Sequence, residues 1–301
     1  MTTHSLIVHP DNLHRMQCIR HPASGCIHSS SLPRRFNGWL SCLHVQLASL
    51  FLPDMFAIQY MSDLHLEIFP GFRVADVKAE VLVLAGDIGD PGSAEYASFI
   101  EDCVSKFKRV FVVLGNHEGY GKPSWDATVA IAREVLSAMG ARLLHRDSVF
   151  IADKLRIAGV TLWSRIEGRA AYDAMCFISD YRRIGGMTVS ESNALHEADV
   201  SWLRAEIAIA EAEGCELVVV THHAPSLRGT SHPKNSGGPL NCAFATDLDH
   251  LVSRKGVAAW IFGHTHFSCI NGKLVSNQRG YADDPDEVGL FDPSRVIMVQ
   301  V

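Results

Sequence analysis

Five short aliphatic runs, each ending abruptly in polar residues, organise the chain from Met55 onward. These runs are residues 56–61, 81–85, 110–114, 217–220 and 258–262. Continuous apolar runs of this length are typical of strands that are buried on both faces, as in α/β sheets. Ligands of such sheets bind beyond the carboxyl ends of the strands, so we expect the five polar ends to converge on one site.

Segments with a helical pattern separate these strands and predict an α/β fold in which helices cover the sheets. We expect helices over residues 91–106, 122–139 and 190–213, with Gly140 and Gly214 directly after the second and third. Residues 149–160 predict a hairpin, and residues 273–276 and 295–301 predict two late strands. The segments 161–188 and 224–241 show no clear period, and we expect them to be loops that border the site and select the substrate.

The first 54 residues differ from the rest, with six histidines, three cysteines, few acids and no apolar period. We expect residues 1–54 to be a disordered extension, or to follow from a start codon assigned too far upstream, and residues 55–301 to form one domain. The apolar stretch 39–52 begins far from the N-terminus for a secretory signal. It is also too short and too polar to span a bilayer, so no membrane span is expected.

Charge and cysteine content narrow the function further. A net charge of −6 argues against a broad basic surface, which makes nucleic acid an unlikely partner. The eight cysteines form no CxxC pair, so zinc fingers, thioredoxin-like sites and disulfide frameworks lack their spacing. A cytoplasmic location fits this cysteine usage. The sequence indicates no particular oligomeric state.

The polar ends of the strands hold a set of metal-binding side chains. The set consists of Asp63, His65, Asp87, Asn116, His222, His264 and His266. Imidazole, carboxylate and amide groups without thiolate suit Mn, Fe, Zn, Co or Ni. Seven groups exceed the needs of one tetrahedral ion, but they fit two ions that share a bridging carboxylate. In Asp-x-His and His-x-His, an extended backbone would point both side chains toward one ion.

Five sequence blocks together carry a family resemblance. In chain order they are Asp63-x-His65, Gly86-Asp87-x-x-Asp90, Gly115-Asn116-His117-Glu118, Thr221-His222-His223-Ala224-Pro225 and Gly263-His264-Thr265-His266. Each block alone is a common turn or cap pattern, but their joint order resembles the calcineurin-like metallophosphoesterase superfamily. The resemblance covers roughly residue 55 to the C-terminus. It implies a four-layer α-β-β-α sandwich of two mixed sheets flanked by helices, with the metal site at the strand C-terminal ends.

The resemblance also implies roles for single residues. Asp63, His65 and His266 would bind one divalent metal, Asn116, His222 and His264 the other, and Asp87 would bridge them, with manganese the favoured ion. A metal-bound hydroxide would attack the phosphorus. His117 would then protonate the leaving oxygen while Asp90 holds its ring.

Other assignments are less direct. Preferring His222 over His223 as the ligand rests on the family pattern alone, and His223 would otherwise orient a ligand or contact the substrate. Asn116 is placed to contact substrate as well as metal. Arg279 lies shortly after the last histidine pair, and its planar guanidinium suits a phosphate group.

The predicted function is metal-dependent hydrolysis of a small phosphodiester or phosphomonoester, and the sequence does not separate these two. A protein phosphatase of the superfamily would normally carry Arg and Gly after Asp90, where Pro91 and Gly92 stand. A nuclease usually adds basic surface and further domains. A non-catalytic scaffold with the same fold is the alternative from another class, and the complete set of ligands argues against it.

Overall fold

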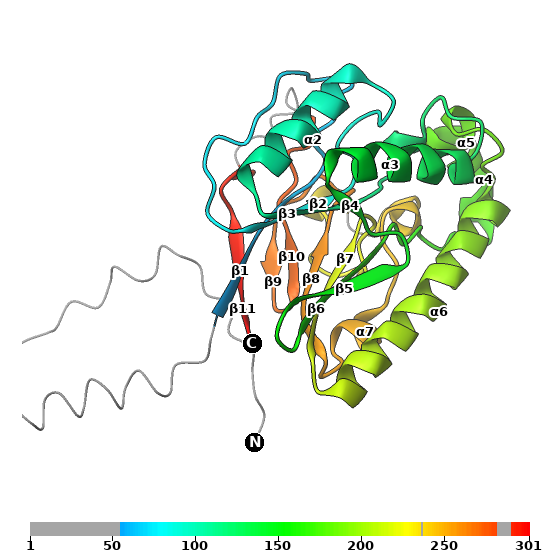
Figure 1. Ribbon diagram of the computed structural model, residues 1–301. Coiled ribbons are helices and arrows are strands. Elements are labelled where there is room, and N and C mark those ends of the chain that lie inside the picture. Colours follow the sequence, from blue (N-terminus) through cyan, green and yellow to red (C-terminus); the bar gives the residue numbers. More distant parts are fainter. Residues whose placement is uncertain (1–54, 236, 282–289) are drawn as a thin grey trace, which may run out of the picture.

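The computed structural model describes residues 55–235, 237–281 and 290–301. Within them, two β-sheets stack face to face and helices cover the outer faces (Figure 1). The extension expected over residues 1–54 lies outside the described residues. None of the described helices is long and apolar enough to cross a membrane.

The first sheet has five strands in the order β11-β1-β2-β3-β4. They are β1 (Met55–Met61), β2 (Val81–Ala85), β3 (Arg109–Val113), β4 (Arg142–Leu143) and β11 (Val296–Gln300). Strands β1 to β4 run parallel, and β11 is antiparallel to β1. The strands that the sequence predicted for this sheet are present. The sequence did not predict β4, which has only two residues.

The second sheet has six strands in the order β5-β6-β7-β8-β10-β9. They are β5 (Asp147–Ala152), β6 (Leu155–Val160), β7 (Glu216–Thr221), β8 (Val257–Phe262), β9 (Ile270–Asn271) and β10 (Leu274–Ser276). β5 and β6 form the expected antiparallel hairpin, and β6, β7, β8 and β10 pair in parallel. Both sheets are therefore mixed.

Alternate residues of each central strand enter different cores. In β2, Val81 and Val83 pack between the two sheets, where they join Val218 and Val220 of β7. Leu82 and Leu84 pack on the other face of the sheet, beneath the helices. Because both faces of these strands are buried, the sequence is apolar at every position rather than at alternate ones.

The helices form the outer layers. α2 (Ala94–Lys106) and α3 (Trp125–Met139) cover the first sheet, while α6 (Val189–Glu213) and the short α7 (Asp249–Val252) cover the second (Figure 1). The predicted four-layer α-β-β-α sandwich is confirmed.

Capping residues decide where the long helices begin. We expected starts at residues 91 and 122, but Ser93 and Ser124 cap the helices, each accepting a hydrogen bond from the backbone N–H three residues later. Thr188 does the same for α6, which begins at Val189, one residue before the range we expected. The predicted ends after Gly140 and Gly214 agree with the structure, and both glycines adopt the left-handed conformation that closes a helix.

We expected the segment 161–188 to be an irregular loop. It instead contains α4 (Arg169–Phe177) and α5 (Asp180–Arg183). α4 follows Gly168 and has no side-chain cap. The exposed apolar residues Tyr172, Met175 and Phe177 also obscure its helical period. The described part of the segment 224–241 is mostly irregular, with a short 3-10 helix at Pro233–Asn235 and the start of another at Asn241.

Candidate active site

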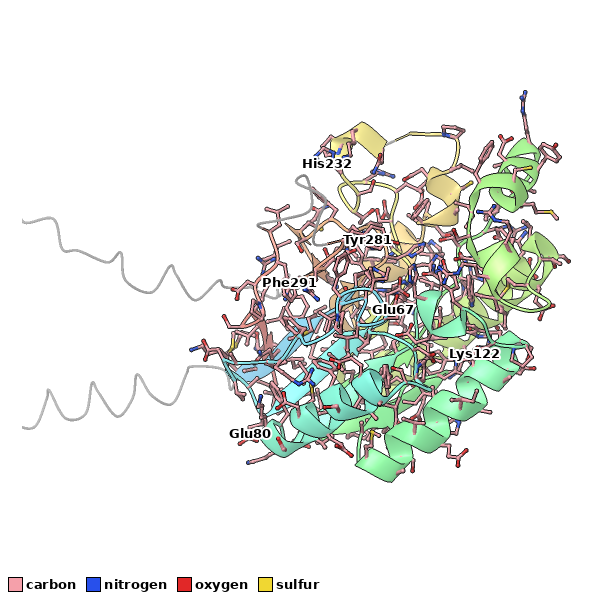
Figure 2. All side chains as sticks on the ribbon, turned by 90° about the horizontal axis from the view of Figure 1, so that it is seen from above. Glu67, Glu80, Lys122, His232, Tyr281 and Phe291 are labelled. Atoms are coloured by element: carbon pink, nitrogen blue, oxygen red, sulfur yellow. The ribbon has the colours of Figure 1, made fainter. Side chains whose placement is uncertain are left out.

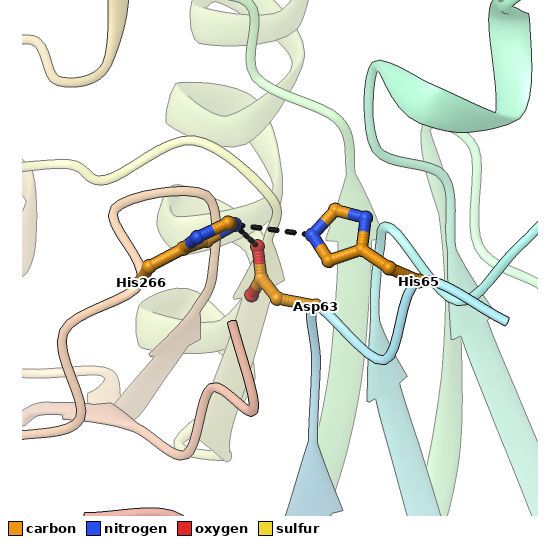
Figure 3. A group of neighbouring side chains, drawn as sticks. All are labelled: Asp63, His65 and His266. Atoms are coloured by element: carbon orange, nitrogen blue, oxygen red, sulfur yellow. Dashed lines mark hydrogen bonds and ion pairs between the residues drawn. The ribbon is translucent and has the colours of Figure 1, made fainter. Parts of the chain in front are cut away.

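The polar strand ends converge, and one group of side chains forms between the ends of β1 and β8. Nε2 of His65 lies 3.1 Å from Nε2 of His266. The same nitrogen of His266 is 3.5 Å from Oδ1 of Asp63 (Figure 3). Ligand atoms of all three residues lie within 4.8 Å of one another, as around a single ion.

A second group forms between the ends of β2, β3, β7 and β8. Asp87, His222 and His264 place ligand atoms within 4.8 Å of one another. Nε2 of His222 is 3.4 Å from Oδ1 of Asp87 and 3.1 Å from Oδ1 of Asn116. Asp87 also belongs to an overlapping group with His65 and His117. The Asp87 carboxylate therefore lies between the two groups.

The backbone conformation of these residues differs from the one we predicted. β1 ends at Met61 and β8 at Phe262, so the residues of both motifs lie beyond the strands. Left-handed φ angles occur at Asp63 (54°), His65 (49°), Asp87 (53°), His264 (69°) and His266 (50°). Such a conformation costs about 1–3 kcal/mol at each non-glycine residue and concentrates at functional sites. Left-handed turns, not an extended backbone, aim the side chains inward.

Two glycines allow the strand ends to approach the ligand groups. A Cβ atom on Gly115 would lie 2.2 Å from Oδ1 of Asp87 and 2.7 Å from Cε1 of His222. On Gly263 it would lie 2.7 Å from Oδ2 of Asp63. Real Cβ atoms do not come this close, so a side chain at either position would displace a carboxylate.

A buried carboxylate ties the ends of β2 and β3 together. Glu118 accepts hydrogen bonds from the backbone N–H groups of Ile88 at 2.8 Å, Gly115 at 2.7 Å and Asp87 at 3.1 Å. Burial and the neighbouring Asp87 raise the pKa of Glu118 to about 7. The turns that carry Asp87 and Asn116 are thus held by one side chain.

Hydrogen bonds at the outer ring nitrogens orient two of the histidines. Nδ1 of His222 lies 2.9 Å from the carbonyl oxygen of Ala85, and Nδ1 of His65 lies 3.4 Å from Oε1 of Glu67. With the N–H on Nδ1, each ring directs the lone pair of Nε2 toward the cluster. This is the arrangement of metal-binding histidines, and the geometry favours His222 over His223.

The buried negative charges of the cluster favour the binding of cations. Asp63 and Asp87 are almost fully buried, and their ion-pair partners in the described part of the chain are histidines, not Lys or Arg. Burial would lower the pKa of His222, but the charge of Asp87 outweighs it and raises the pKa to about 10. Two buried carboxylates surrounded by imidazoles are costly unless positive charge is supplied. Two divalent ions fit this set of donors.

The amide of Asn116 is held in a fixed orientation. Its Nδ2 donates to Oδ1 of Asp180 at 2.8 Å and to the Tyr120 hydroxyl at 3.1 Å, and that hydroxyl donates to Asp180 at 2.7 Å. The amide oxygen therefore faces His222. Sequence reasoning missed Asp180, because it lies on α5 within the segment expected to be irregular and outside every recognised block.

The carboxylate beside His117 is Glu67, at 2.8 Å from Oε1 to Nδ1. Burial alone would raise the pKa of Glu67, but hydrogen bonds with His117 and His65 hold it at about 2. Burial alone would lower the pKa of His117, but Asp87 and Glu67 raise it to about 8. Sequence reasoning also missed Glu67, although it continues the alternation of Asp63 and His65.

Asp90, which we predicted to hold the ring of His117, has other hydrogen-bond partners in the structure. The carboxylate of Asp90 accepts hydrogen bonds from Nζ of Lys122 at 2.6 Å and from the N–H of Gly92 at 2.8 Å. Its carbonyl oxygen accepts from Ser93 at the start of α2. Lys122 and the turn before α2 therefore engage Asp90, and Glu67 takes the position beside the histidine.

Arg279, which we predicted to bind phosphate, contacts the loop after β1 in the structure. Its guanidinium donates to the carbonyl oxygen of Leu64 at 3.1 Å and lies 5.2 Å from the ring centre of Phe72, so it supports the loop after β1. Gly280, with φ of 66°, turns the chain. Tyr281 reaches the cluster instead, with ring centres 4.6 Å from His266.

His223, for which we predicted a role in orienting a ligand or contacting the substrate, is buried beside His264. Only 1% of its surface is exposed, and its Nδ1 lies 2.9 Å from the Ser164 hydroxyl. Its ring centre is 4.0 Å from that of His264. The ring of His223 therefore packs against the ring of His264.

A cavity of about 560 Å³ opens over the cluster. Asp87, Asn116, His117, His264 and His266 line its base. Residues from α4, α5 and the segment 231–244 form its sides, together with Tyr281. Figure 2, which looks onto this end of the molecule, shows Tyr281 and Glu67 near the middle of the face. Both segments expected to border the site contribute to this lining, although 161–188 does so with helices and not as a loop.

We predict that Gly115→Ala weakens metal binding roughly 10- to 100-fold, the usual range when the support of a ligand is disturbed. The new methyl group would displace the Asp87 carboxylate. Metal content per chain and titration with Mn²⁺ measure the effect. Gly92→Ala is the control, because Gly92 is exposed and a Cβ there meets no atom closer than 3.4 Å. Equal metal binding by the two variants would contradict this account of Gly115.

Comparisons with known proteins agree with this geometry. An uncharacterised protein, L509, of Acanthamoeba polyphaga mimivirus is 25% identical over 261 residues, covering 75% of this chain and 92% of the viral protein. The crystal structure of phosphopantetheinyl hydrolase from Mycobacterium tuberculosis shares the fold, with a TM-score of 0.60, 15% identity and coverage of 83% of this chain and 97% of that one. The sequence model of the calcineurin-like phosphoesterases matches residues 40–268. The chain belongs to the calcineurin-like phosphoesterase family.

Proposed function

We propose that this protein hydrolyses small phosphodiesters or phosphomonoesters with the help of two divalent metal ions. The observation that carries the proposal is the two donor groups with the Asp87 carboxylate between them, and His117 beside Asp87 in one cavity. The first ion would be held by Asp63, His65 and Asp87 with His266, and the second by Asp87, Asn116, His222 and His264. When bound, the ions would supply an activated water and stabilise charge on the phosphoryl oxygens.

His117 would act on the leaving group. Its Nδ1 is engaged by Glu67, while its Nε2 is 4.0 Å from Oδ2 of Asp87 and 3.5 Å from the Tyr281 hydroxyl. A ring held at Nδ1 keeps Nε2 directed at the space above Asp87, where a phosphoryl group would sit. Asn116, as a ligand at the same base, would contact a phosphoryl oxygen as well.

Two further details belong to the proposal. Manganese is our preferred ion, because oxygen donors from Asp63, Asp87 and Asn116 accompany the imidazoles. The cytoplasm is our proposed location, on the basis of cysteine spacing. The complete ligand set and the contact of His117 with Glu67 favour an enzyme over a scaffold of the same fold.

The decisive experiment compares p-nitrophenyl and phenyl esters, as diesters and monoesters, with Mn, Fe, Zn, Ni and Mg. Asp87→Ala should remove metal and activity together. His117→Ala should retain metal and lose about 100-fold or more with phenyl esters, because proton donation contributes roughly 10²–10⁴ in rate. The loss should be smaller with p-nitrophenyl esters, whose leaving oxygen needs less protonation. Equal losses with both leaving groups would exclude this role for His117, and inactivity of metal-loaded protein on all esters would exclude the function.

A second prediction separates the two candidate partners of His117. Glu67→Gln should lower kcat roughly 10-fold or more, because the amide supports the imidazole less well than a carboxylate does. Asp90→Asn is the matched control and should change kcat little, since its partner is Lys122. Steady-state kinetics with metal content measured on each sample provide the comparison. A larger loss for Asp90→Asn would reverse the assignment.

A further inference from the structure

The cavity over the metal cluster has an apolar wall. Phe244 stacks on the ring of His264, with ring centres 4.9 Å apart and planes 25° apart. Leu240 and Ile178 belong to the same hydrophobic cluster as Phe244, and all three line the cavity. The wall therefore begins beside His264, one of the ligand candidates.

The wall continues to the rim of the cavity on α4. Phe177 lines the cavity and is 69% exposed. Burial of such a side chain against an apolar group is favourable, so an apolar ligand that covers it would gain binding free energy. Tyr172, on the same helix, is 73% exposed but does not line the cavity.

The charges of the cavity argue against a highly charged substrate. Among the described residues that line it, Lys234 is the one Lys or Arg. The carboxylate of Asp180 is engaged by Asn116 and Tyr120. A substrate with a second phosphate group away from the metals would need more basic side chains than this lining offers.

We propose that the substrate is a phosphoester whose organic group is uncharged and largely apolar, an alkyl or aryl group that lies along Phe244, Leu240, Ile178 and Phe177. This inference rests on the proposed function and specifies its substrate class. The phosphoryl group occupies the base over Asp87, and the cavity of about 560 Å³ has room for a substituent of ordinary small-molecule size. Nucleoside polyphosphates and other polyanions are poor substrates.

The test uses two homologous series at concentrations where they remain monomeric. One consists of p-nitrophenyl alkyl phosphodiesters from methyl to hexyl, and the other of alkyl phosphomonoesters of the same lengths. Each added CH₂ group should raise kcat/KM roughly two- to fourfold, the upper value being full burial of a methylene. The series includes both ester classes, so the result does not depend on which of them the enzyme prefers.

Substitutions inside and outside the apolar wall test whether the alkyl chain binds along it. Leu240→Ser and Phe177→Ser should flatten the dependence of kcat/KM on chain length, because each removes apolar surface from the wall. Tyr172→Ser is the matched control on α4 and should leave the dependence unchanged. Metal content and the thermal unfolding midpoint, measured on every variant, show whether each protein is folded and loaded.

The possible outcomes separate the two proposals. Hydrolysis that does not increase with chain length, or that increases equally in wild type and in both wall variants, overturns the substrate class and leaves the phosphoesterase function standing. Faster hydrolysis of a nucleoside diphosphate ester than of the hexyl esters also overturns it. If metal-loaded protein cleaves no ester in either series, the proposed function itself fails.

Discussion

Two buried carboxylates, Asp63 and Asp87, impose the constraint on which the rest of the site depends. Neither has a Lys or Arg partner among the described residues, and both are surrounded by imidazoles. An uncompensated buried charge costs several kcal/mol, even after the protein relaxes around it. The site is therefore stable when positive charge is brought to it, and Nε2 atoms of His65 and His222 face the positions where that charge would lie.

The fold supplies the geometry for this concentration of charge. Parallel strands of both sheets end at the same edge, and glycines at the strand ends let the backbone approach the carboxylates. Five of the ligand candidates adopt left-handed backbone conformations, whose combined cost amounts to several kcal/mol. The two hydrophobic layers outside the sheets and the layer between them provide the stability that holds these turns in place.

Features of the structure that depend on local sequence pattern could be predicted. Apolar runs predicted the buried strands, and glycines marked the ends of α3 and α6. The ordered blocks brought together the side chains that the structure collects in two groups. Spacing alone did not predict that Asp63 and His65 turn inward through positive φ angles, because an extended strand would also place them on one side.

The unpredicted part depends on long-range contacts. Whether Asp90 or Glu67 faces His117 is decided by Lys122, which lies 32 residues from Asp90 and pairs with it. Asp180 meets Asn116 across 64 residues, from a helix without a capping side chain or a clear period. Arg279 faces Phe72 and the loop after β1, a contact that no spacing in the sequence indicates.

The apolar wall and the metal cluster belong to one cavity, so selection of the organic group and chemistry at the phosphoryl group would occur side by side. The central claim is that Asp87 bridges two ions. Anomalous scattering from crystals grown with Mn²⁺ measures this directly. The account predicts two peaks about 3.5–4 Å apart, one on each side of the Asp87 carboxylate. A single peak, or two peaks away from Asp87, would contradict it.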